Sequence, residues 1–300
     1  MKITTVASCL TLAGTLGLSG GAVAYSIDDH YVGSDDHDSS HHRDVIGFKE
    51  GFEIHGIDVS EDSSHHLVVD VYTNFTDNNG IYPEDTYNNK GISFGDLFLS
   101  NNWTPSGDAA SGYEGDDHST GTQWTHGFSL DNRWGATDDG SDHNGKLYKV
   151  EGKTNDPFKL SDDYINCCTY RNGQEVTLDE SKLSTSDIVN TGSWSVHSSA
   201  HNGRHDDDSD GHDSDDDHNS NTPDGYIRFN IGASYYDLFG ADSGDLALHW
   251  AMTCGNDTIE GETHVGQPPD TSVPEPATLA LMMVGLLGFG ASRRRNGASA

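Results

Sequence analysis

The sequence predicts an all-β protein, an antiparallel β-sandwich or jelly-roll-like domain with acidic loop insertions. Two observations support this fold class. Short segments rich in β-branched and aromatic residues recur along the chain, and glycine, asparagine and aspartate separate them. No long amphipathic helical pattern competes with these segments, so their spacing favours a sandwich. A β-helix is the alternative, but the chain shows no fixed repeat period that would support it.

Nine segments are expected to form strands, and each is short, aromatic and β-branched. They are 52–59, 67–75, 91–100, 122–130, 146–152, 174–178, 192–198, 225–232 and 245–254. In the second segment Val69 and Val71 share one face, while Asp70 and Tyr72 share the other, which is the alternation of a strand. Residues 179–190 are expected to form one short helix.

Residues 1–24 are expected to form a signal peptide. The segment has one lysine, Lys2, then an apolar middle, then the small residues Ala22 and Ala24 around Val23. This pattern predicts export and cleavage after Ala24 by signal peptidase. The alternative is an N-terminal anchor helix, but glycine, serine and threonine weaken the apolar run.

The other end of the chain contains a second apolar segment, 277–291, which follows a linker at 266–272. Its 15 residues are fewer than the roughly 20 that usually span a bilayer. Pro274 and Pro276 precede this short transmembrane helix, because proline cannot continue a helix from upstream. Arg293, Arg294 and Arg295 follow it and are expected to stay in the cytoplasm. The rest of the chain would then lie across the membrane.

The last residues resemble a known sorting signal. Val273, Pro274, Glu275 and Pro276, then the apolar helix, then the arginines, are similar to the PEP-CTERM signal, here residues 273–296. The resemblance implies export by a Gram-negative bacterium that makes exopolysaccharide. It also implies that an exosortase in the inner membrane recognises the tail and cleaves near the PEP motif. The helix would then be a transient membrane anchor, and the product would reach the cell surface or extracellular matrix.

Two readings accompany this resemblance. A simple C-terminal membrane anchor is the alternative to sorting and cleavage. The segment 246–262, just upstream of the tail, is also similar to a stretch of exosortase-dependent surface proteins. That second resemblance implies a surface role and no known activity.

The secreted domain, 25–265, is strongly acidic. The whole chain has 16 basic and 49 acidic residues, and removal of both signals leaves 12 and 48, a net charge of −36. Such a charge repels nucleic acid and anionic lipid and attracts cations. The acids gather in islands between apolar segments, above all in the Asp/His-rich insertions 28–44 and 197–222. This uneven distribution predicts a folded scaffold with acidic loops, not a disordered chain.

One acidic island has the spacing of a calcium loop. Between 197 and 218 it contains eight aspartates and five histidines. An EF-hand type loop would take its ligands from Asp206, Asp208, Asp210, the backbone of His212, Ser214 and Asp217, with Gly211 at the turn. Aspartate replaces the usual glutamate at the last position, and no helix flanks the loop. A solvated, flexible insertion is the alternative.

A second, weaker calcium match begins near residue 140. It uses Asp142, Asn144 and Gly145 and ends at Glu151, but its first position is Gly140, which has no side-chain ligand. A glycine-rich hairpin turn is the favoured interpretation of this stretch.

Three cysteines remain after export, and they allow one disulfide. Cys254 is expected to pair with a member of the Cys167–Cys168 pair, with Cys168 as the preferred partner. A vicinal Cys167–Cys168 bridge is the strained alternative. The chain has no CxxC pairs, which argues against a structural zinc site.

The sequence contains none of the common catalytic motifs, and its many carboxylates single out no pair for hydrolysis. We therefore expect a non-enzymatic, exosortase-processed protein of the cell surface or biofilm matrix. Its Asp-rich loops would bind divalent cations such as Ca²⁺, and exopolysaccharide is its expected matrix partner. One alternative is a secreted carbohydrate-binding module or glycan hydrolase of lectin-like fold, in which some of the five tryptophans stack on sugars. A purely structural matrix protein is the other.

Overall fold

The computed structural model describes residues 24–34, 44–47, 49–79, 91–136, 139–165, 170–198 and 222–266. The strands of this part are β1 (Tyr25–Asp28), β2 (Ile54–Glu61), β3 (Leu67–Thr73), β4 (Leu97–Ser100), β5 (His126–Leu130), β6 (His143–Lys149), β7 (Phe158–Leu160), β8 (Glu175–Leu178), β9 (Ile188–Ser198), β10 (Gly225–Asn230), β11 (Gly244–Ala251) and β12 (Thr258–Val265).

The helices of the described part are short. Two are α-helical, α1 (Lys49–Phe52) and α2 (Tyr235–Phe239). The others are single 3₁₀ segments, namely η1 (Asn74–Asn79), η2 (Ala109–Ser111), η3 (Arg133–Gly135), η4 (Ser161–Asp163), η5 (Glu180–Lys182) and η6 (Thr185–Asp187). Strands therefore form most of the regular secondary structure in the described part, as the sequence predicted.

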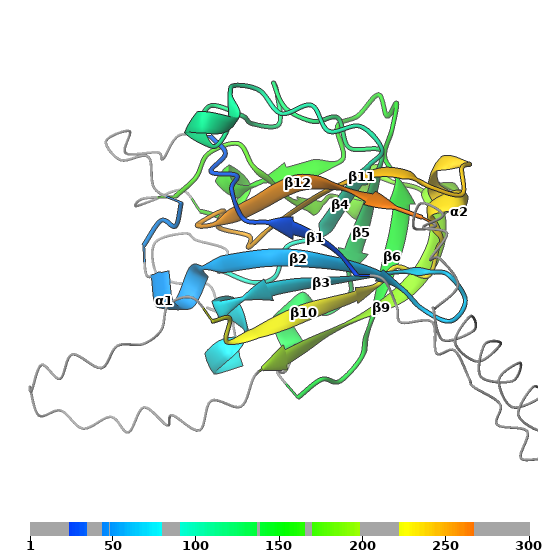
Figure 1. Cartoon of the computed structure of the whole chain (residues 1–300), viewed down its shortest axis with the longest axis horizontal. Coiled ribbons are helices and arrows are strands. Elements are labelled where there is room, and N and C mark those ends of the chain that lie inside the picture. Colours follow the sequence, from blue (N-terminus) through cyan, green and yellow to red (C-terminus); the bar gives the residue numbers. More distant parts are fainter. Residues whose placement is uncertain are drawn as a thin grey trace, which may run out of the picture.

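Ten strands form one antiparallel sheet that curls until its two edges meet. The strand order is β1-β2-β3-β10-β9-β6-β5-β4-β11-β12, and every neighbouring pair is antiparallel. Figure 1 shows the two edge strands, β1 and β12, side by side. Ile27 of β1 lies against Gly261 of β12, where a Cβ would meet its Cγ2 atom at 2.6 Å. At one end of this seam the Tyr25 hydroxyl donates to the Gly266 carbonyl oxygen.

The inside of the curled sheet is the main hydrophobic core. Strand β11 shows how the alternation works, because Leu246, Leu248 and Trp250 belong to this core and are fully buried. The intervening Ala247 belongs to a second cluster on the outer face. At roughly 25 cal/mol per Å² of apolar area, these buried aliphatic and aromatic side chains supply the dominant folding energy.

A small hairpin covers part of the outer face. Strands β7 and β8 pair antiparallel as a separate two-stranded sheet. Leu178 of β8 packs with Phe98, Trp124, Tyr148 and Val150 in the second cluster. The strands under this hairpin are thus buried on both faces, which explains why all four residues of β4 and all five of β5 are buried.

The all-β, antiparallel part of the prediction is confirmed, and the sandwich part is not. Each of the nine expected segments contains a strand or most of one. The sequence missed the edge strands β1 and β12 and the short β7. The prediction of one helix over 179–190 is wrong, because η5 and η6 are separate turns and β9 begins at Ile188. Asp179 caps the first turn by accepting from the Ser181 N–H, and at the second turn the Asp187 carboxylate accepts from the Ser184 N–H and hydroxyl.

The weaker calcium match at 140–151 is also wrong. Asn144 and Gly145 lie in β6, so the supposed ligands extend along a strand and cannot surround one ion. Gly145 pairs with Gly192 of β9, and a Cβ at either position would collide with the Phe128 ring, at 2.3 and 2.9 Å. The glycine pair makes space for an aromatic ring in the core.

Candidate functional site

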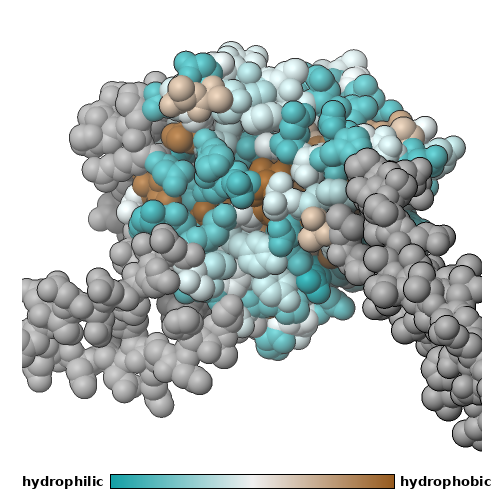
Figure 2. Space-filling view, viewed as in Figure 1, coloured by the Kyte–Doolittle hydropathy of each residue, from teal (hydrophilic) through white to brown (hydrophobic). Residues whose placement is uncertain are grey.

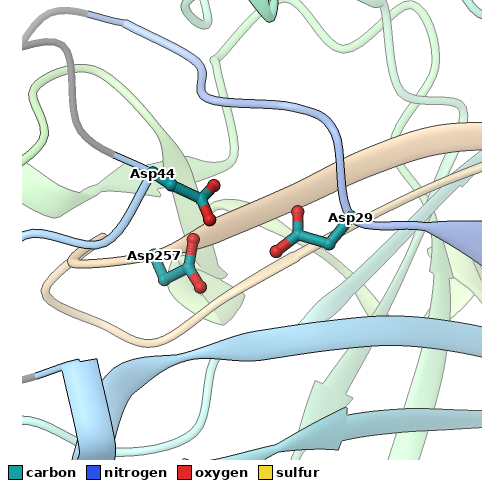
Figure 3. A group of neighbouring side chains, drawn as sticks. All are labelled: Asp29, Asp44 and Asp257. Carbon is teal, nitrogen blue, oxygen red and sulfur yellow. The ribbon is translucent and has the colours of Figure 1, made fainter. Parts of the chain in front are cut away.

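Three aspartates from separate parts of the chain bring their carboxylates together at one end of the curled sheet. Asp29 directly follows β1, Asp44 lies in the segment 44–47, and Asp257 directly precedes β12. One carboxylate oxygen from each lies within 4.8 Å of the other two. Figure 3 shows the three side chains pointing toward a common space. We call this group the aspartate triad.

The three members differ in how the protein holds them. Asp257 is fully buried, and its carboxylate accepts hydrogen bonds from the backbone N–H groups of Ile54, at 2.6 Å, and Thr258, at 2.8 Å. The Oδ1 atom of Asp29 is buried and has no hydrogen-bond partner among the described residues. Asp44 is exposed. The triad is therefore fixed on its inner side and open to water on its outer side.

The triad has more negative than positive charge around it. The Arg171 guanidinium donates through Nη2 to the backbone oxygen of Asp44 at 2.8 Å, and its charge acts to lower the pKa of all three aspartates. Glu53, which acts to raise the pKa of Asp29, is itself paired with Lys49 at 3.0 Å. The three triad carboxylates and the Arg171 guanidinium alone sum to a charge of about −2 when all are ionised.

Burial and repulsion make this charge costly. Burial is the largest cause that raises the pKa of Asp29 and of Asp257 well above the ordinary value, and neighbouring triad carboxylates add to it. Burial also raises the pKa of Asp44, against the opposing effect of Arg171. The protein can relieve the repulsion by keeping protons there or by binding a cation. Oxygen ligands of this kind are those that hard divalent cations prefer.

A second candidate site is a cleft of about 400 Å³ lined by residues of 118–125 and 150–158 and by Glu175 of β8. In it, His118 lies between two carboxylates, with Nδ1 2.9 Å from Glu175 and Nε2 2.8 Å from Asp156. The hydrogen bond to Glu175 raises the pKa of His118 to about 9, against the effect of burial, and Asp156 adds to the rise. Trp124 and Phe158 also line the cleft. At neutral pH it therefore combines an imidazolium, carboxylates and aromatic rings.

A buried polar network supports the cleft from behind. His249 is fully buried, with Nδ1 3.1 Å from one oxygen of Glu260 and Nε2 2.8 Å from the Glu175 carbonyl oxygen. The other Glu260 oxygen accepts from Trp103 Nε1 and Thr122 Oγ1, each at 2.8 Å. Burial opposes the charged form of His249, but its hydrogen bond to Glu260 and the nearby carboxylates outweigh this effect and raise the pKa of His249. These carboxylates have protein donors, unlike the Oδ1 atom of Asp29.

Most site residues that the sequence predicted lie outside the described residues. They are the calcium-loop positions Asp206, Asp208, Asp210, His212, Ser214 and Asp217, the signal-peptide residue Ala22, the PEP motif Val273–Pro276, and the cluster Arg293–Arg295. Ala24 is described, and it is an exposed residue directly before β1. The apolar segment 277–291 also lies outside. Within the described ranges, no helix is long and apolar enough to cross a membrane.

The predicted disulfide lies partly outside the described residues. Cys254 is buried in the main core and has no disulfide partner in the described part of the chain, while Cys168 is outside that part. Burial raises the pKa of Cys254 to about 12, so its thiol stays protonated. The pairing of Cys168 with Cys254 stays a prediction.

The tryptophans mostly serve the fold. Trp194 and Trp250 are fully buried in the main core, and Trp124 is 5% exposed. Trp134, at 42%, is an exposed large hydrophobic residue. The face in Figure 2 is mainly hydrophilic, and its hydrophobic residues form separate small areas. Trp124 is the tryptophan that lines the cleft.

Sequence reasoning missed the aspartate triad, although two of its members lie in a predicted acidic island. Asp29 and Asp44 stand near the two ends of 28–44, and Asp257 stands far away in the segment 246–262. The sequence signal for the third member was that Asp257 is a single acidic residue in the turn directly before β12. Only the meeting of β1 with β12 brings it to the island.

Comparison with known proteins identifies one segment of the chain. Residues 272–295 match the PEP-CTERM protein-sorting motif. Neither a curated protein nor a solved structure matches the chain. The chain thus carries the sorting motif of exosortase substrates, and the β-domain must be interpreted from its own residues.

Proposed function

We propose that this protein is an exosortase substrate of the cell surface or extracellular matrix, exported, anchored transiently by its C-terminal helix and then released from it. The observation that carries the proposal is the PEP-CTERM motif at 272–295, which implies an exosortase as processing partner. The β-domain would be the delivered part, with no enzymatic activity of its own. It would act in the exopolysaccharide matrix of a biofilm.

The limits of the fold support processing at both ends. Strand β1 begins at Tyr25, directly after the proposed signal-peptidase site at Ala24. Strand β12 ends at Val265, directly before the linker 266–272 and the motif. Cleavage after Ala24 and near the PEP motif would therefore remove no residue of the curled sheet.

Intact-mass spectrometry of the protein from its native host tests the proposal. The expected mass is that of a chain beginning at Tyr25 and lacking Arg293, Arg294 and Arg295. Deletion of the host exosortase gene should restore the mass of the arginine-containing chain. Mature protein that keeps the three arginines in the wild-type host would contradict exosortase processing.

We also propose that the acidic loops of the delivered domain bind divalent cations, with Ca²⁺ as the natural candidate outside the cell. The net charge of −33 on the whole chain supports this, because such a surface concentrates cations. The Asp-rich insertions 28–44 and 197–222 would supply oxygen ligands, with 206–217 as the predicted calcium loop. Total calcium bound at equilibrium dialysis, with and without competing salt, measures this property.

The cleft beside His118 favours a second candidate function, carbohydrate binding. Its volume of about 400 Å³ is within the usual range for small-ligand sites. Aromatic rings of Trp124 and Phe158 stand beside charged groups of His118, Asp156 and Glu175, a combination that can recognise a sugar ring and its hydroxyls. A glycan array probed with wild-type protein and His118→Ala tests this function. A glycan signal in EDTA that the variant abolishes is the expected result.

A further inference from the structure

We infer that the aspartate triad is a specific site for a hard divalent cation, Ca²⁺ in the exported protein, and that the ion fastens the two edges of the sheet together. The inference rests on the proposed cation binding and names the residues and the role of one site. The predicted calcium loop 206–217 is a different segment, so the two sites can be separated by experiment.

The position of the triad at the seam supports the closing role. Strands β1 and β12 are the two ends of the strand order, so no further strand of the described residues is hydrogen-bonded to either outer edge. Tyr25 contacts Gly266 at one end of the seam, and Ile27 packs on Gly261 in its middle. The triad lies at the other end, where Asp29 follows β1 and Asp257 precedes β12. An ion bound there would join the two edges directly.

The unpartnered oxygen of Asp29 points to a missing ligand. Buried polar atoms are nearly always hydrogen-bonded, and a buried charged oxygen without a partner is more costly than a neutral one. The Oδ1 atom of Asp29 is buried without such a partner among the described residues. Figure 3 shows its carboxylate turned toward Asp44 and Asp257, where a cation would satisfy it.

The donor set and the charge select the class of ion. Each triad member offers a carboxylate oxygen, and the group includes no cysteine or histidine, the ligands that favour zinc or copper. Three carboxylates and the Arg171 guanidinium sum to about −2, which a divalent cation neutralises. Ca²⁺ takes six to eight oxygens in flexible geometry, and water can reach the exposed Asp44 side to complete the shell.

Calorimetric titration of the full chain, purified in detergent and stripped with EDTA, tests the inference with CaCl₂ as the probe. The test variant is Asp29→Asn, which keeps the size of the side chain and removes one charge. Among the described residues the Oδ1 atom of Asp29 has no hydrogen-bond partner to lose. The matched control is Asp28→Asn, one position away on the exposed side of β1. A third variant replaces Asp206, Asp208 and Asp210 by asparagine.

The inference predicts that the saturable site of the triad is present in the wild type, in the control and in the triple loop variant. Asp29→Asn should weaken this site at least tenfold. Hydrogen exchange of β1 and β12 should slow in Ca²⁺ in the wild type and the control.

Two other outcomes reject the inference in different ways. If only the triple loop variant loses the saturable site, the triad is not the ion site, and the broader proposal of cation binding stands. If no variant and no wild-type sample shows a saturable site, both proposals fail. Circular dichroism of each variant in EDTA checks that it is folded, and Asp44→Asn replaces Asp29→Asn if the latter is not.

Discussion

Two of the regions in which the molecule buries acidic side chains hold these side chains in opposite ways. Beside the cleft, Glu175 and Glu260 are buried but contact imidazoles, since His118 lies 2.9 Å from the first and His249 lies 3.1 Å from the second. At the seam, Arg171 is the described residue whose charge lowers the pKa of all three members of the aspartate triad. In the first region, imidazole groups of the protein contact the buried carboxylates. In the second region, the described carboxylates outnumber the positive groups beside them.

The difference shows what kind of buried acid indicates a ligand. A carboxylate that is satisfied by protein donors stabilises one arrangement of the chain and needs nothing from solution. A carboxylate with a buried, unpartnered oxygen and like charges around it is costly until a proton or an ion arrives. The balance of charges within each cluster, and not the number of acids, separates the two cases.

The largest effect is expected at Glu260, the centre of the satisfied region. Glu260→Ala leaves His249, Trp103 and Thr122 without their acceptor, so it should lower the free energy of unfolding by about 3 to 5 kcal/mol. Glu262→Ala, an exposed acid on the same strand, is the matched control and should change it by less than about 0.5 kcal/mol. Urea unfolding measures both free energies. Equal effects of the two variants would contradict the claim that burial and hydrogen bonding make Glu260 important for stability.

The second-largest effect is that of Asp29→Asn on the free energy of unfolding, and it should change sign when Ca²⁺ is added. In EDTA, Asp29→Asn removes repulsion at the triad and should raise the free energy of unfolding by about 1 kcal/mol. In Ca²⁺ at 100 times the wild-type dissociation constant, the wild type should gain about 2.7 kcal/mol, and the variant, weakened at least tenfold, should gain about 1.4 kcal/mol or less. Urea unfolding in the two buffers measures the crossover. A variant that is less stable than wild type in both buffers by the same amount would show that Asp29 has only a structural role.

A third effect depends on pH and belongs to the cleft. The folded pKa of His118 is raised to about 9, so its pairing stabilises the fold fully below the unfolded value of 6.5 and is lost as pH rises through 9. After allowance for partial exposure, the contribution is about 1 to 2 kcal/mol. The stability difference between wild type and His118→Gln should therefore shrink between pH 6.5 and pH 9. A constant difference across this range would contradict the charged state of His118.

The smallest effect is expected at an exposed pair of the same chemistry. His264 on β12 lies 2.9 Å from Asp245 on β11, but both side chains are more than half exposed. His264→Ala should change the free energy of unfolding by less than about 0.5 kcal/mol. A cost as large as that of the buried pairs would mean that contact alone, without burial, sets the energy.

The sequence predicted the central strands well because their residues alternate or are continuously apolar. It missed β12, because Glu260 and Glu262 interrupt the apolar pattern and the reason for burying Glu260 is a partner on another strand. It missed β1, which has four residues and runs directly into an acidic island. Its single-helix prediction for 179–190 failed because capping side chains favour short turns there.

The sorting motif and the triad show the two extremes of what a sequence can disclose. The motif is read from adjacent residues, and the comparison confirms it. The triad depends on contacts between distant segments, because Asp257 meets Asp29 only when the sheet curls and its edge strands come together. Acidic composition predicted cation binding in general, but it directed attention to the densest island, 206–217, and not to these three residues.

The most direct measurement is a crystal structure of the protein grown in CaCl₂, with anomalous differences collected at a wavelength where calcium scatters. The account predicts an anomalous peak in the space between Asp29, Asp44 and Asp257, about 2.3 to 2.6 Å from an oxygen of each. The same crystals soaked in EDTA should lose the peak. Crystals that show three ordered carboxylates, saturating calcium in the buffer and no peak between them would contradict the account.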